Sequence, residues 1–547
     1  MQHRTLVLLT GFVLTLPTAA QGSLFVDPSA PPGGDGASWS SAFAELQDAL
    51  DGARLDPSVQ SIHVAAGTYR PDRGTLDASL SFELVDGVAL LGGFPAGGGT
   101  LAERDPTAHP TTLTGDLAAD DAPPDEAGWI TGNDENSFHV VRAVGLGCGT
   151  QLDGFVVRAG NATAQGFGAG AGRGGNVYVE GGELVVRGCR LLRGYARDGG
   201  ALAAVDAGVE VELCELAENR ADNLGGGAAV LGTVAGVWRG CSFEANVGGA
   251  GAGLFVGPPT GVLGAGSPAR IEGCSFRANR GVVGGTAGGG LAAAGSAVAV
   301  ADCEFVANYA NGGGGVYLST SVGYVERCTF AGNLSEGDGG GALAVFDVQA
   351  ALRAPTVVSS CALLGNSGGV LAVQASVELT GCTIADNVLA EQPIGLDWPA
   401  VLGQDASVLL ANSIVWGNLD LGVFGDERDH LVSHTAFSTD FLVVNSIVED
   451  WAGALPGSGL GVDPVFRDPL GPDGDGFTVL DNDYRLWGGS PAVDAGDDAA
   501  VPAQECCDVD GLPRFRDGDG DGAATVDLGA YESPARVPVT LDLASHP

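Results

Sequence analysis

A short cluster of cysteine, a hydrophobic residue and asparagine returns along the chain at nearly regular intervals. It reads GCSFEAN at Cys241 and GCSFRAN at Cys274. Eight copies carry cysteine, at Cys189, Cys214, Cys241, Cys274, Cys303, Cys328, Cys361 and Cys382, and two later copies carry Ser413 and Ser446 instead. Neighbouring cysteines lie 21 to 33 residues apart. A repeat of that length favours a solenoid, whose turns absorb insertions, over a propeller, whose blades need about 40 residues or more.

Each repeat contains three short stretches with the pattern of a β-strand. In the first, a glycine cluster runs into apolar residues, as in GGGVYLS (Gly313–Ser319). The second is an alternating stretch such as SVELTG (Ser376–Gly381), and the cysteine cluster is the third. Period-two alternation buries every second side chain on one face of a strand. The repeat therefore predicts an all-β chain folded as a parallel β-helix, with three short strands per coil and coils stacked ~4.8 Å apart.

The asparagine that closes each repeat is expected to stack on its equivalents in one turn of the coil. These residues are Asn219, Asn246, Asn279, Asn308, Asn333, Asn366, Asn387 and Asn418. Asparagine suits a tight turn because it tolerates a left-handed backbone, and its side-chain amide can bond to the copies above and below. The eight cysteines should form a second ladder inside the coil. Their Cβ atoms would lie about one rung apart, wider than the roughly 3.5–4.5 Å of a disulfide, so we expect free buried thiols.

Two further cysteines are adjacent, at Cys506 and Cys507. They either form a strained disulfide, which would stabilise the carboxyl-terminal region, or remain reduced. The sequence leaves both states open.

The first residues have the pattern of a secretory signal peptide. Arg4 precedes an apolar run from Leu6 to Leu16, and small residues follow up to Ala20, where cleavage is expected. Residues 1–20 are therefore assigned to the signal peptide. No later segment is apolar over the ~20 residues that a membrane-spanning helix needs. The mature protein is expected to be exported and soluble, without a transmembrane segment.

The charge of the chain excludes some partners. All 25 basic residues are arginine, against 67 acidic residues, and the formal net charge is −42. Binding to nucleic acid or to an anionic membrane depends on cationic side chains that neutralise phosphates, so both are poor partners. Cations, glycans and basic proteins remain open. A hydrophobic content of 45% argues for a packed fold rather than disorder.

Both ends of such a rod need covering, because an open β-helix exposes unpaired strand edges. The stretch Ser38–Leu55 predicts an amino-terminal capping helix with Trp39 and Phe43 on its apolar stripe. The expected organisation is an amino-terminal cap with irregular first coils at residues 21–150, regular coils at 151–454, an acidic, irregular closing cap at 455–534 and a tail at 535–547.

Several motifs resemble those of exported bacterial right-handed parallel β-helix repeat proteins. VAAGTYRPD (Val64–Asp72) and GVALLGGF (Gly87–Phe94) are similar to their amino-terminal module. GSPAVDAGD (Gly489–Asp497) and VDLGAYE (Val526–Glu532) are similar to a choice-of-anchor Q type carboxyl-terminal region. The repeats also resemble, more weakly, those of polymorphic outer membrane proteins. The resemblance implies a right-handed, pectin-lyase-like solenoid that is secreted or associated with the bacterial cell surface.

Two groups of carboxylates have the character of a calcium site. DGDGDG places Asp517, Asp519 and Asp521 at alternate positions, as in a calcium-binding loop, but position 12 is Leu528, and the nearest acid, Asp527, falls one residue early. The second group is Asp473, Asp475, Asp481 and Asp483. Calcium is the only cofactor that these patterns indicate, and a solvated acidic loop is the alternative in so acidic a chain.

No arrangement of residues in the sequence identifies a catalytic site. Parallel β-helices include polysaccharide lyases, which need an arginine or lysine base beside calcium carboxylates, and hydrolases, which need paired carboxylates. Lysine is absent, and Asp120 and Asp121 lie in a loop-like insertion. The arginines of the coils that have few acids beside them are Arg270, Arg277, Arg327 and Arg353. The sequence thus favours a non-catalytic, monomeric scaffold that recognises a glycan or protein at the cell surface, with a pectate-lyase-like polysaccharide lyase or a glycoside hydrolase as the alternative.

Overall fold

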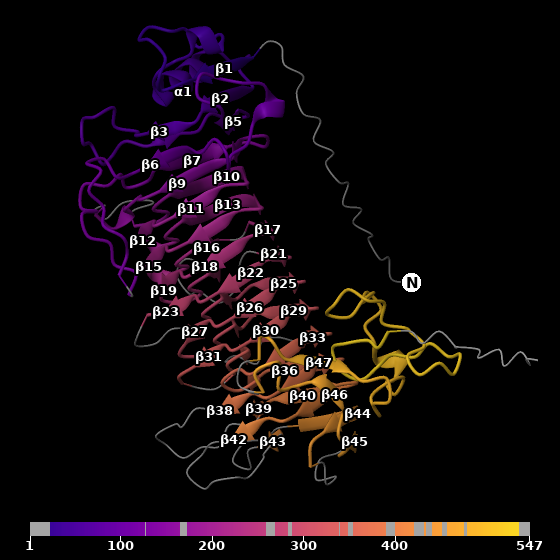
Figure 1. Ribbon diagram of the computed structural model, residues 1–547. Coiled ribbons are helices and arrows are strands. Elements are labelled where there is room, and N and C mark those ends of the chain that lie inside the picture. The colour runs from indigo at the N-terminus through magenta and orange to yellow at the C-terminus, as the bar shows by residue number, and fades with distance from the viewer. Residues whose placement is uncertain are drawn as a thin grey trace, which may run out of the picture.

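The chain folds into one elongated rod of stacked coils. The structure is a computed structural model that describes residues 22–534, except 126, 165–171, 233, 259–267, 283–286, 338–339, 348–353, 390–399, 421–430, 434–439, 451–456 and 475–478. The assigned signal peptide, the tail, Arg353 and Asp475 lie outside the described residues. The first described residues, from Gly22 onward, occupy one end of the rod, and the carboxyl-terminal segment, residues 466–534, lies beside its other half (Figure 1).

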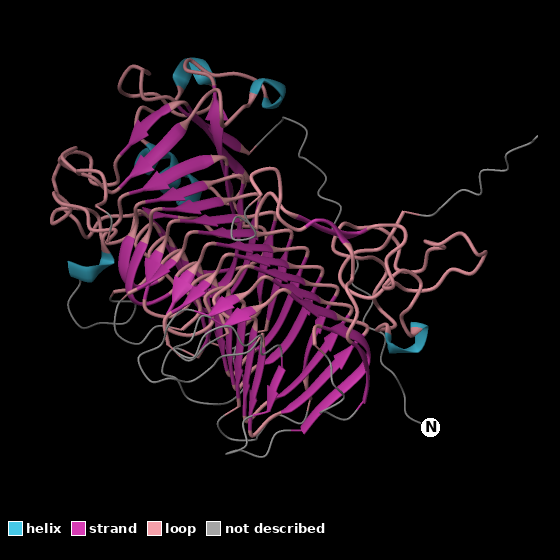
Figure 2. Ribbon diagram, turned by 60° about the horizontal axis from the view of Figure 1, so that its bottom comes forward, coloured by secondary structure: helices cyan, strands magenta, loops and turns pink. Residues whose placement is uncertain are grey.

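The coils build three ladders of parallel strands, which confirms the predicted fold class (Figure 2). The cysteine face holds the strands that follow the cysteines and their counterparts in the first coils: β3 (Gly67–Tyr69), β6 (Thr111–Thr114), β9 (Phe155–Arg158), β11 (Arg190–Leu192), β14 (Glu215–Ala217), β18 (Ser242–Glu244), β22 (Ser275–Arg277), β26 (Glu304–Val306), β30 (Thr329–Ala331), β34 (Ala362–Leu364), β37 (Thr383–Ala385) and β41 (Ile414–Trp416).

The glycine face holds the strands that follow the glycine clusters, and the alternating face holds the third set. The glycine face comprises β4 (Phe82–Glu83), β7 (Val141–Leu146), β16 (Ala228–Leu231), β20 (Leu254–Gly257), β24 (Leu291–Ala294), β28 (Val316–Ser319), β32 (Leu343–Phe346), β35 (Val370–Val373), β39 (Val401–Gln404) and β43 (Leu431–Ser433). The alternating face comprises β1 (Ser23–Val26), β2 (Ser61–Ala65), β5 (Ala89–Phe94), β8 (Gln151–Asp153), β17 (Gly236–Arg239), β21 (Ala269–Glu272), β25 (Ala297–Ala301), β29 (Val322–Glu326), β33 (Thr356–Ser359), β36 (Ser376–Thr380), β40 (Ser407–Ala411), β44 (Asp440–Val448) and β45 (Gly457–Leu460). Two long strands, β10 (Val177–Arg187) and β13 (Leu202–Glu212), cross from the glycine face to the alternating face.

A fourth, shorter ladder of strands follows the asparagines. The sequence repeat did not predict it. It comprises β12 (Tyr195–Asp198), β15 (Arg220–Leu224), β19 (Val247–Gly248), β23 (Arg280–Gly281), β27 (Tyr309–Ala310) and β31 (Leu334–Ser335), and β38 (Val388–Leu389) pairs with β42 (Leu419–Asp420) further along. In the carboxyl-terminal segment, β46 (Phe466–Asp468) pairs with β47 (Asp483–Leu486) in antiparallel orientation. The 3-10 turns are η1 (Trp39–Ser41), η2 (Leu101–Glu103), η3 (Ala162–Ala164) and η4 (Asp498–Ala500).

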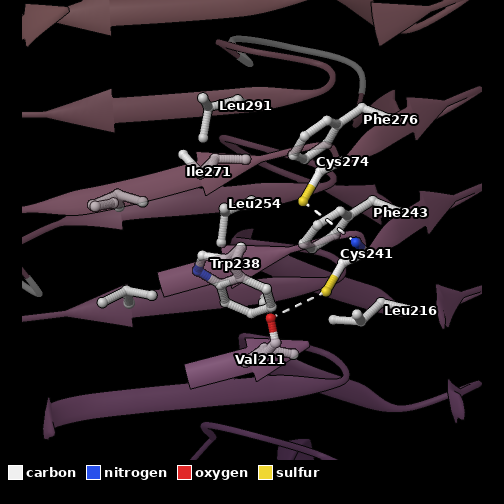
Figure 3. Packing of buried hydrophobic residues seen from close by; sticks show 14 of the residues in the cluster. Val211, Leu216, Trp238, Cys241, Phe243, Leu254, Ile271, Cys274, Phe276 and Leu291 are labelled. Carbon is white, nitrogen blue, oxygen red and sulfur yellow. Dashed lines mark hydrogen bonds between the residues drawn. The ribbon is translucent and has the colours of Figure 1, made fainter. Parts of the chain in front are cut away.

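The interior of the rod is filled by like residues stacked from coil to coil. Phe243, Phe276, Phe305 and Phe330 lie in consecutive coils with ring centroids 4.5–4.8 Å apart and nearly parallel planes. Trp238 is fully buried and packs against Phe243 (Figure 3). Because the strands pair in register, each inward side chain meets its own counterpart one rung away.

The asparagines form a continuous hydrogen-bonded ladder at the turn after the cysteine face. The Nδ2 of each asparagine from Asn219 to Asn387 donates to the Oδ1 of the next, at 2.8–3.0 Å. Each Nδ2 also donates to a backbone carbonyl, as Asn279 does to Phe243. The left-handed residue of the turn precedes the asparagine, as at Ala245, Ala278 and Ala307, because the asparagine itself turns its amide inward.

The eight ladder cysteines are buried and free. Cys241 shows the environment that they share: its Sγ donates to the carbonyl of Val211, and its backbone N–H donates to the Sγ of Cys274 (Figure 3). Burial raises the pKa of Cys382 to about 12. A thiol that stays protonated at neutral pH is a poor nucleophile and a poor metal ligand, so these cysteines act as packing groups.

The amino-terminal helix α1 (Leu46–Leu55) is shorter than the sequence suggests. The buried face of this helix packs against the first strands and includes Leu46, Ala49 and Leu50. Phe43 instead pairs as extended backbone with Val26 of β1, so the helix begins only at Leu46 and excludes the first part of the predicted stripe. Trp39 lies in an aromatic cluster with Phe25 rather than on the helix.

The carboxyl-terminal segment lies along the flank of the last coils, whereas the sequence suggested a cap over the end of the rod. Val479, Tyr484 and Ala530 pack against Val306 and Leu364 on the outer side of the cysteine face. Further along, Leu486 and Leu528 pack against Ile414 and Ile447. Polar contacts join the two parts, including Tyr484 Oη donating to Asp386 Oδ2 at 2.7 Å. The cysteine face is therefore covered from β26 onward, and its first half, where Arg190, Glu244 and Arg277 are exposed, is open.

Asn279→Ala should destabilise the coils by roughly 3 kcal/mol, because it removes the acceptor of the buried backbone N–H of Asn246, one of the two acceptors of Asn246 Nδ2, and a donor to the carbonyl of Phe243. Urea unfolding followed by the fluorescence of Trp238, which packs on Phe243 one coil away, measures the change. Asn311→Ala, at an exposed turn position, is the matched control and should cost little. Equal unfolding midpoints for the two variants would show that the ladder contributes nothing to stability.

Candidate functional site

The open half of the cysteine face contains a groove of about 530 Å³. Its floor is formed by the outward side chains of five consecutive strands, β3, β6, β9, β11 and β14. Strand register places Thr68, Thr112, Val156, Arg190 and Glu215 in one row across these coils. The groove is lined by Thr68, Pro110, Thr112, Val156, Arg158, Arg190, Leu192, Arg193, Glu215, Ala217 and Glu218. Hydroxyl, guanidinium and carboxylate groups thus share one surface with a few apolar side chains.

Two ion pairs bridge neighbouring coils inside the groove. Arg190 Nε lies 2.6 Å from Glu215 Oε2, and Arg193 Nε lies 2.7 Å from Glu218 Oε2. Arg193 and Glu218 occupy equivalent turn positions with a left-handed backbone, at φ 55° and 57°. The same turn recurs in later coils, so the left-handed geometry belongs to the fold. In these two coils it also brings a charged side chain to the rim of the groove.

Arg158 differs from the other two arginines of the groove. It is half-buried at the end of β9, where it lies beside Leu192 of the next coil in register. Its Nε is buried, and within the part of the chain that the structure describes its guanidinium has neither a hydrogen-bond acceptor nor a carboxylate partner. A buried donor without an acceptor costs about 1–3 kcal/mol. Arg158 lines the groove, so its cationic guanidinium lies at the groove wall without a carboxylate partner among the described residues.

The arginines weighed as bases for a lyase are all ion-paired where they are described. Arg270 pairs with Glu272, Arg277 with Glu304, and Arg327 with Asp302 at 2.7 Å and Glu326 at 3.0 Å. An arginine held by carboxylates is stabilised as the cation. These arginines therefore have no geometry suited to accepting a proton.

The first predicted calcium group is only partly assembled. Asp517 and Asp519 come within 4.8 Å of each other and of Asp494, a residue that the sequence pattern did not include. Asp521 lies apart from this group, although its backbone N–H donates to Asp519. Asp527 is buried and accepts the backbone N–H groups of Asp494 and Ser533. Three carboxylates carry six oxygens, the lower limit of the six to eight that Ca²⁺ takes, and calcium binding here stays a prediction.

The described carboxylates of the second predicted calcium group do not form a cluster of three. Asp473, Asp481 and Asp483 do not form a group of three with carboxylate oxygens within 4.8 Å of one another, and Asp475 lies outside the described residues. Asp483 instead pairs with Arg485 at 3.1 Å. Calcium binding at this second group also stays a prediction.

The insertion before β7 holds an acidic group that spacing alone did not reveal. Asp116, Asp120 and Glu135 lie within 4.8 Å of one another. Asp121, from the pair considered as catalytic, instead accepts from Asn136, and burial raises its pKa to about 6. Asp116 and Glu135 are too far apart in sequence for a motif search to join them.

A buried charged cluster fastens the carboxyl-terminal segment to the coils. Arg514 is fully buried, and its Nη1 lies 3.0 Å from Glu532. Glu505 lies nearby and accepts a hydrogen bond from Ser360 of the coil. Burial raises the pKa of Glu505 to about 7 and that of Glu532 to about 9. One arginine thus faces more carboxylates than it can neutralise.

Comparison with known proteins agrees with the fold. Residues 260–424 match the family model described as a right handed beta helix region. The chain is similar to pectate lyase Pel9A (TM-score 0.33, 11% identity, 94% of this chain and 97% of that chain). It is also similar to tailspike protein 3 of bacteriophage CBA120 (0.39, 11%, 80% and 59%) and to PfbA, a surface adhesin of Streptococcus pneumoniae (0.27, 8%, 76% and 85%). No curated protein matches the chain significantly. The rod is thus a right-handed parallel β-helix, and the activities of these proteins remain their own.

Raising the pH should loosen the carboxyl-terminal segment. Glu505 has a pKa above its ordinary value of 4.5, so folding favours its protonated form, and the stability that it contributes is lost as the pH rises from about 4.5 to about 7. This loss is on the order of 2–3 kcal/mol. Thermal unfolding between pH 5 and 8 should show a falling midpoint for the wild type and a shallower fall for Glu505→Gln.

Glu244→Gln is the matched control for this pH series, because Glu244 is exposed on the open half of the cysteine face. It should keep the pH profile of the wild type. A Glu505→Gln profile that parallels the wild type would contradict the assignment of this titration to Glu505.

Proposed function

We propose that the protein is an exported, non-catalytic recognition protein that binds glycans carrying acidic groups in the groove of the cysteine face. In this proposal the groove accepts a stretch of polysaccharide across the coils, with a uronate carboxylate or a sulfate ester next to Arg158. Export is inferred from the apolar segment Leu6–Leu16 and the small residues up to Ala20.

The unpaired guanidinium of Arg158 is the observation that carries the proposal. Arg190 and Arg193 already have carboxylate partners from the next coil, whereas Arg158 has none among the described residues. A guanidinium presents a planar fork of donors that matches a carboxylate or a sulfate. The hydroxyls of Thr68 and Thr112, in the same groove, supply the neutral hydrogen-bonding groups that sugar hydroxyls need.

The overall negative charge does not prevent an anion from binding at this place. At physiological ionic strength the Debye length is about 8 Å, so charges on distant parts of the rod are largely screened. Three arginines and two glutamates line the groove, which makes it locally basic. The remote negative charge mainly lowers the rate at which an acidic glycan approaches the protein. The charges and hydrogen-bonding groups of the groove determine the affinity of the bound glycan.

The ion pairs favour binding over catalysis. Both glutamates of the groove are held by arginines, at 2.6 Å and 2.7 Å. A hydrolase needs one carboxyl group that donates a proton and a second that acts as base or nucleophile. The described groove therefore offers recognition groups without an available acid–base pair.

A glycan array probed with the purified mature chain tests the proposal. We expect binding to glycans that carry uronate or sulfate groups and little binding to neutral glycans. Arg158→Ala should weaken binding to the best glycan by about 10- to 100-fold, because it removes charge-assisted hydrogen bonds worth about 1.5–3 kcal/mol.

Arg277→Ala is the matched control, because Arg277 is exposed on the same face and is paired with Glu304 outside the groove. It should bind like the wild type. Equal losses in both variants, or a wild type that binds no acidic glycan, would overturn the proposal. Release of unsaturated products that absorb in the ultraviolet would show a lyase and contradict the absence of catalysis.

A further inference from the structure

Cys506 and Cys507 form a pair of adjacent thiols on the outside of the carboxyl-terminal segment. Their Sγ atoms lie 2.6 Å apart, about half an ångström more than the length of a disulfide bond. Cys506 is exposed and Cys507 is half-buried. All eight ladder cysteines, in contrast, are enclosed within the coils. The pair is therefore both close enough to react and open to reagents.

The residues on either side of the pair are fixed in the structure. Glu505 is held by Ser360 of the coil, and Asp508 accepts the backbone N–H groups of Asp510, Leu512 and Glu532 at 2.7–3.0 Å. Cys507 itself pairs as backbone with Pro513. The two sulfurs are thus kept next to each other by anchors at both ends, and bond formation needs little movement of the chain.

We propose that Cys506 and Cys507 are a reversible dithiol–disulfide pair, and so a redox modification site on the flank of the rod. The oxidant is a small-molecule or protein disulfide. The thiolate of one cysteine attacks this disulfide, forms a mixed disulfide and releases one thiol. The second cysteine then attacks the first, which forms the internal S–S bond and releases the second thiol. Two thiols of the protein are oxidised while one external disulfide is reduced to two thiols, and the thiol protons pass to the released thiols.

The two cysteines have different roles in this exchange. Cys506 is the attacking residue because it is the more exposed. The hydrogen bond between the two sulfurs raises the pKa of Cys507 to about 11, which keeps the proton on Cys507 at neutral pH. Cys507 is then the resolving residue, already in contact with the sulfur that it must attack.

Reduction of the bond should be easy as well. Consecutive Cα atoms lie about 3.8 Å apart across a trans peptide bond, whereas disulfides usually join Cα atoms about 4.4–6.8 Å apart. Exposed and constrained disulfides are the labile ones, and they respond to the redox state of their surroundings. Cys506 and Cys507 lie on the carboxyl-terminal segment and not among the groove residues, so their redox state is independent of the proposed glycan binding.

Peptide mass spectrometry tests the proposal on the full mature chain. The protein is reduced with dithiothreitol, exchanged into oxidised glutathione, and then denatured in iodoacetamide and digested with trypsin. Cleavage after Arg485 and Arg514 gives a peptide, residues 486–514, whose only cysteines are this pair. We expect this peptide to be unalkylated and lighter by two hydrogens than the reduced form. Dithiothreitol should restore two alkylation sites.

Single variants separate the two roles and supply the control. Cys507→Ser should stop at a glutathione adduct on Cys506, because the resolving thiol is missing, and Cys506→Ser should lose the reaction. Cys148→Ser, which removes the other exposed cysteine, should behave like the wild type. Two alkylated cysteines after oxidation, a lasting glutathione adduct in the wild type, or a bond from either cysteine to Cys148 would overturn the proposal.

Discussion

In-register stacking of parallel coils is the constraint on which the rest of the structure depends. Each coil satisfies its backbone hydrogen bonds with the coil before and the coil after it, so equivalent positions are brought one rung apart. Side chains in the interior therefore meet their own kind, as Phe276 meets Phe243 and Phe305. Insertions are tolerated only at turns, because a change of length within a strand would break this register.

The same constraint explains why the fold was predictable from sequence and why some parts were not. Stacking forces equivalent residues to recur, so the spacing of Cys241, Cys274 and the other cysteines is enough to predict the coil. The length of the helix was not predictable, because Phe43 is drawn into pairing with Val26, a contact outside the local pattern. The position of the carboxyl-terminal segment depends on contacts such as that between Tyr484 and Asp386, almost a hundred residues apart.

The candidate groove was also missed in the sequence, for a related reason. Arg190 and Glu215 are partners only because strand register places them side by side on consecutive coils. Arg158 differs from the other groove arginines because it has no carboxylate partner among the described residues. The spacing of residues in a sequence cannot show that such a partner is lacking. The calcium pattern located part of an acidic group: Asp517 and Asp519 come together as the motif suggests, whereas their third neighbour, Asp494, comes from a separate turn that the motif does not include.

The flank position of the carboxyl-terminal segment changes the mechanical character of the rod. A bare solenoid transmits interactions only between neighbouring coils, so a pulling force can peel it from one end, one coil at a time. Here one segment contacts Val306 on β26 and Ile447 on β44, positions separated by several coils. Peeling of the final coils must therefore break these lateral contacts together, and the segment acts as a splint along that half of the rod.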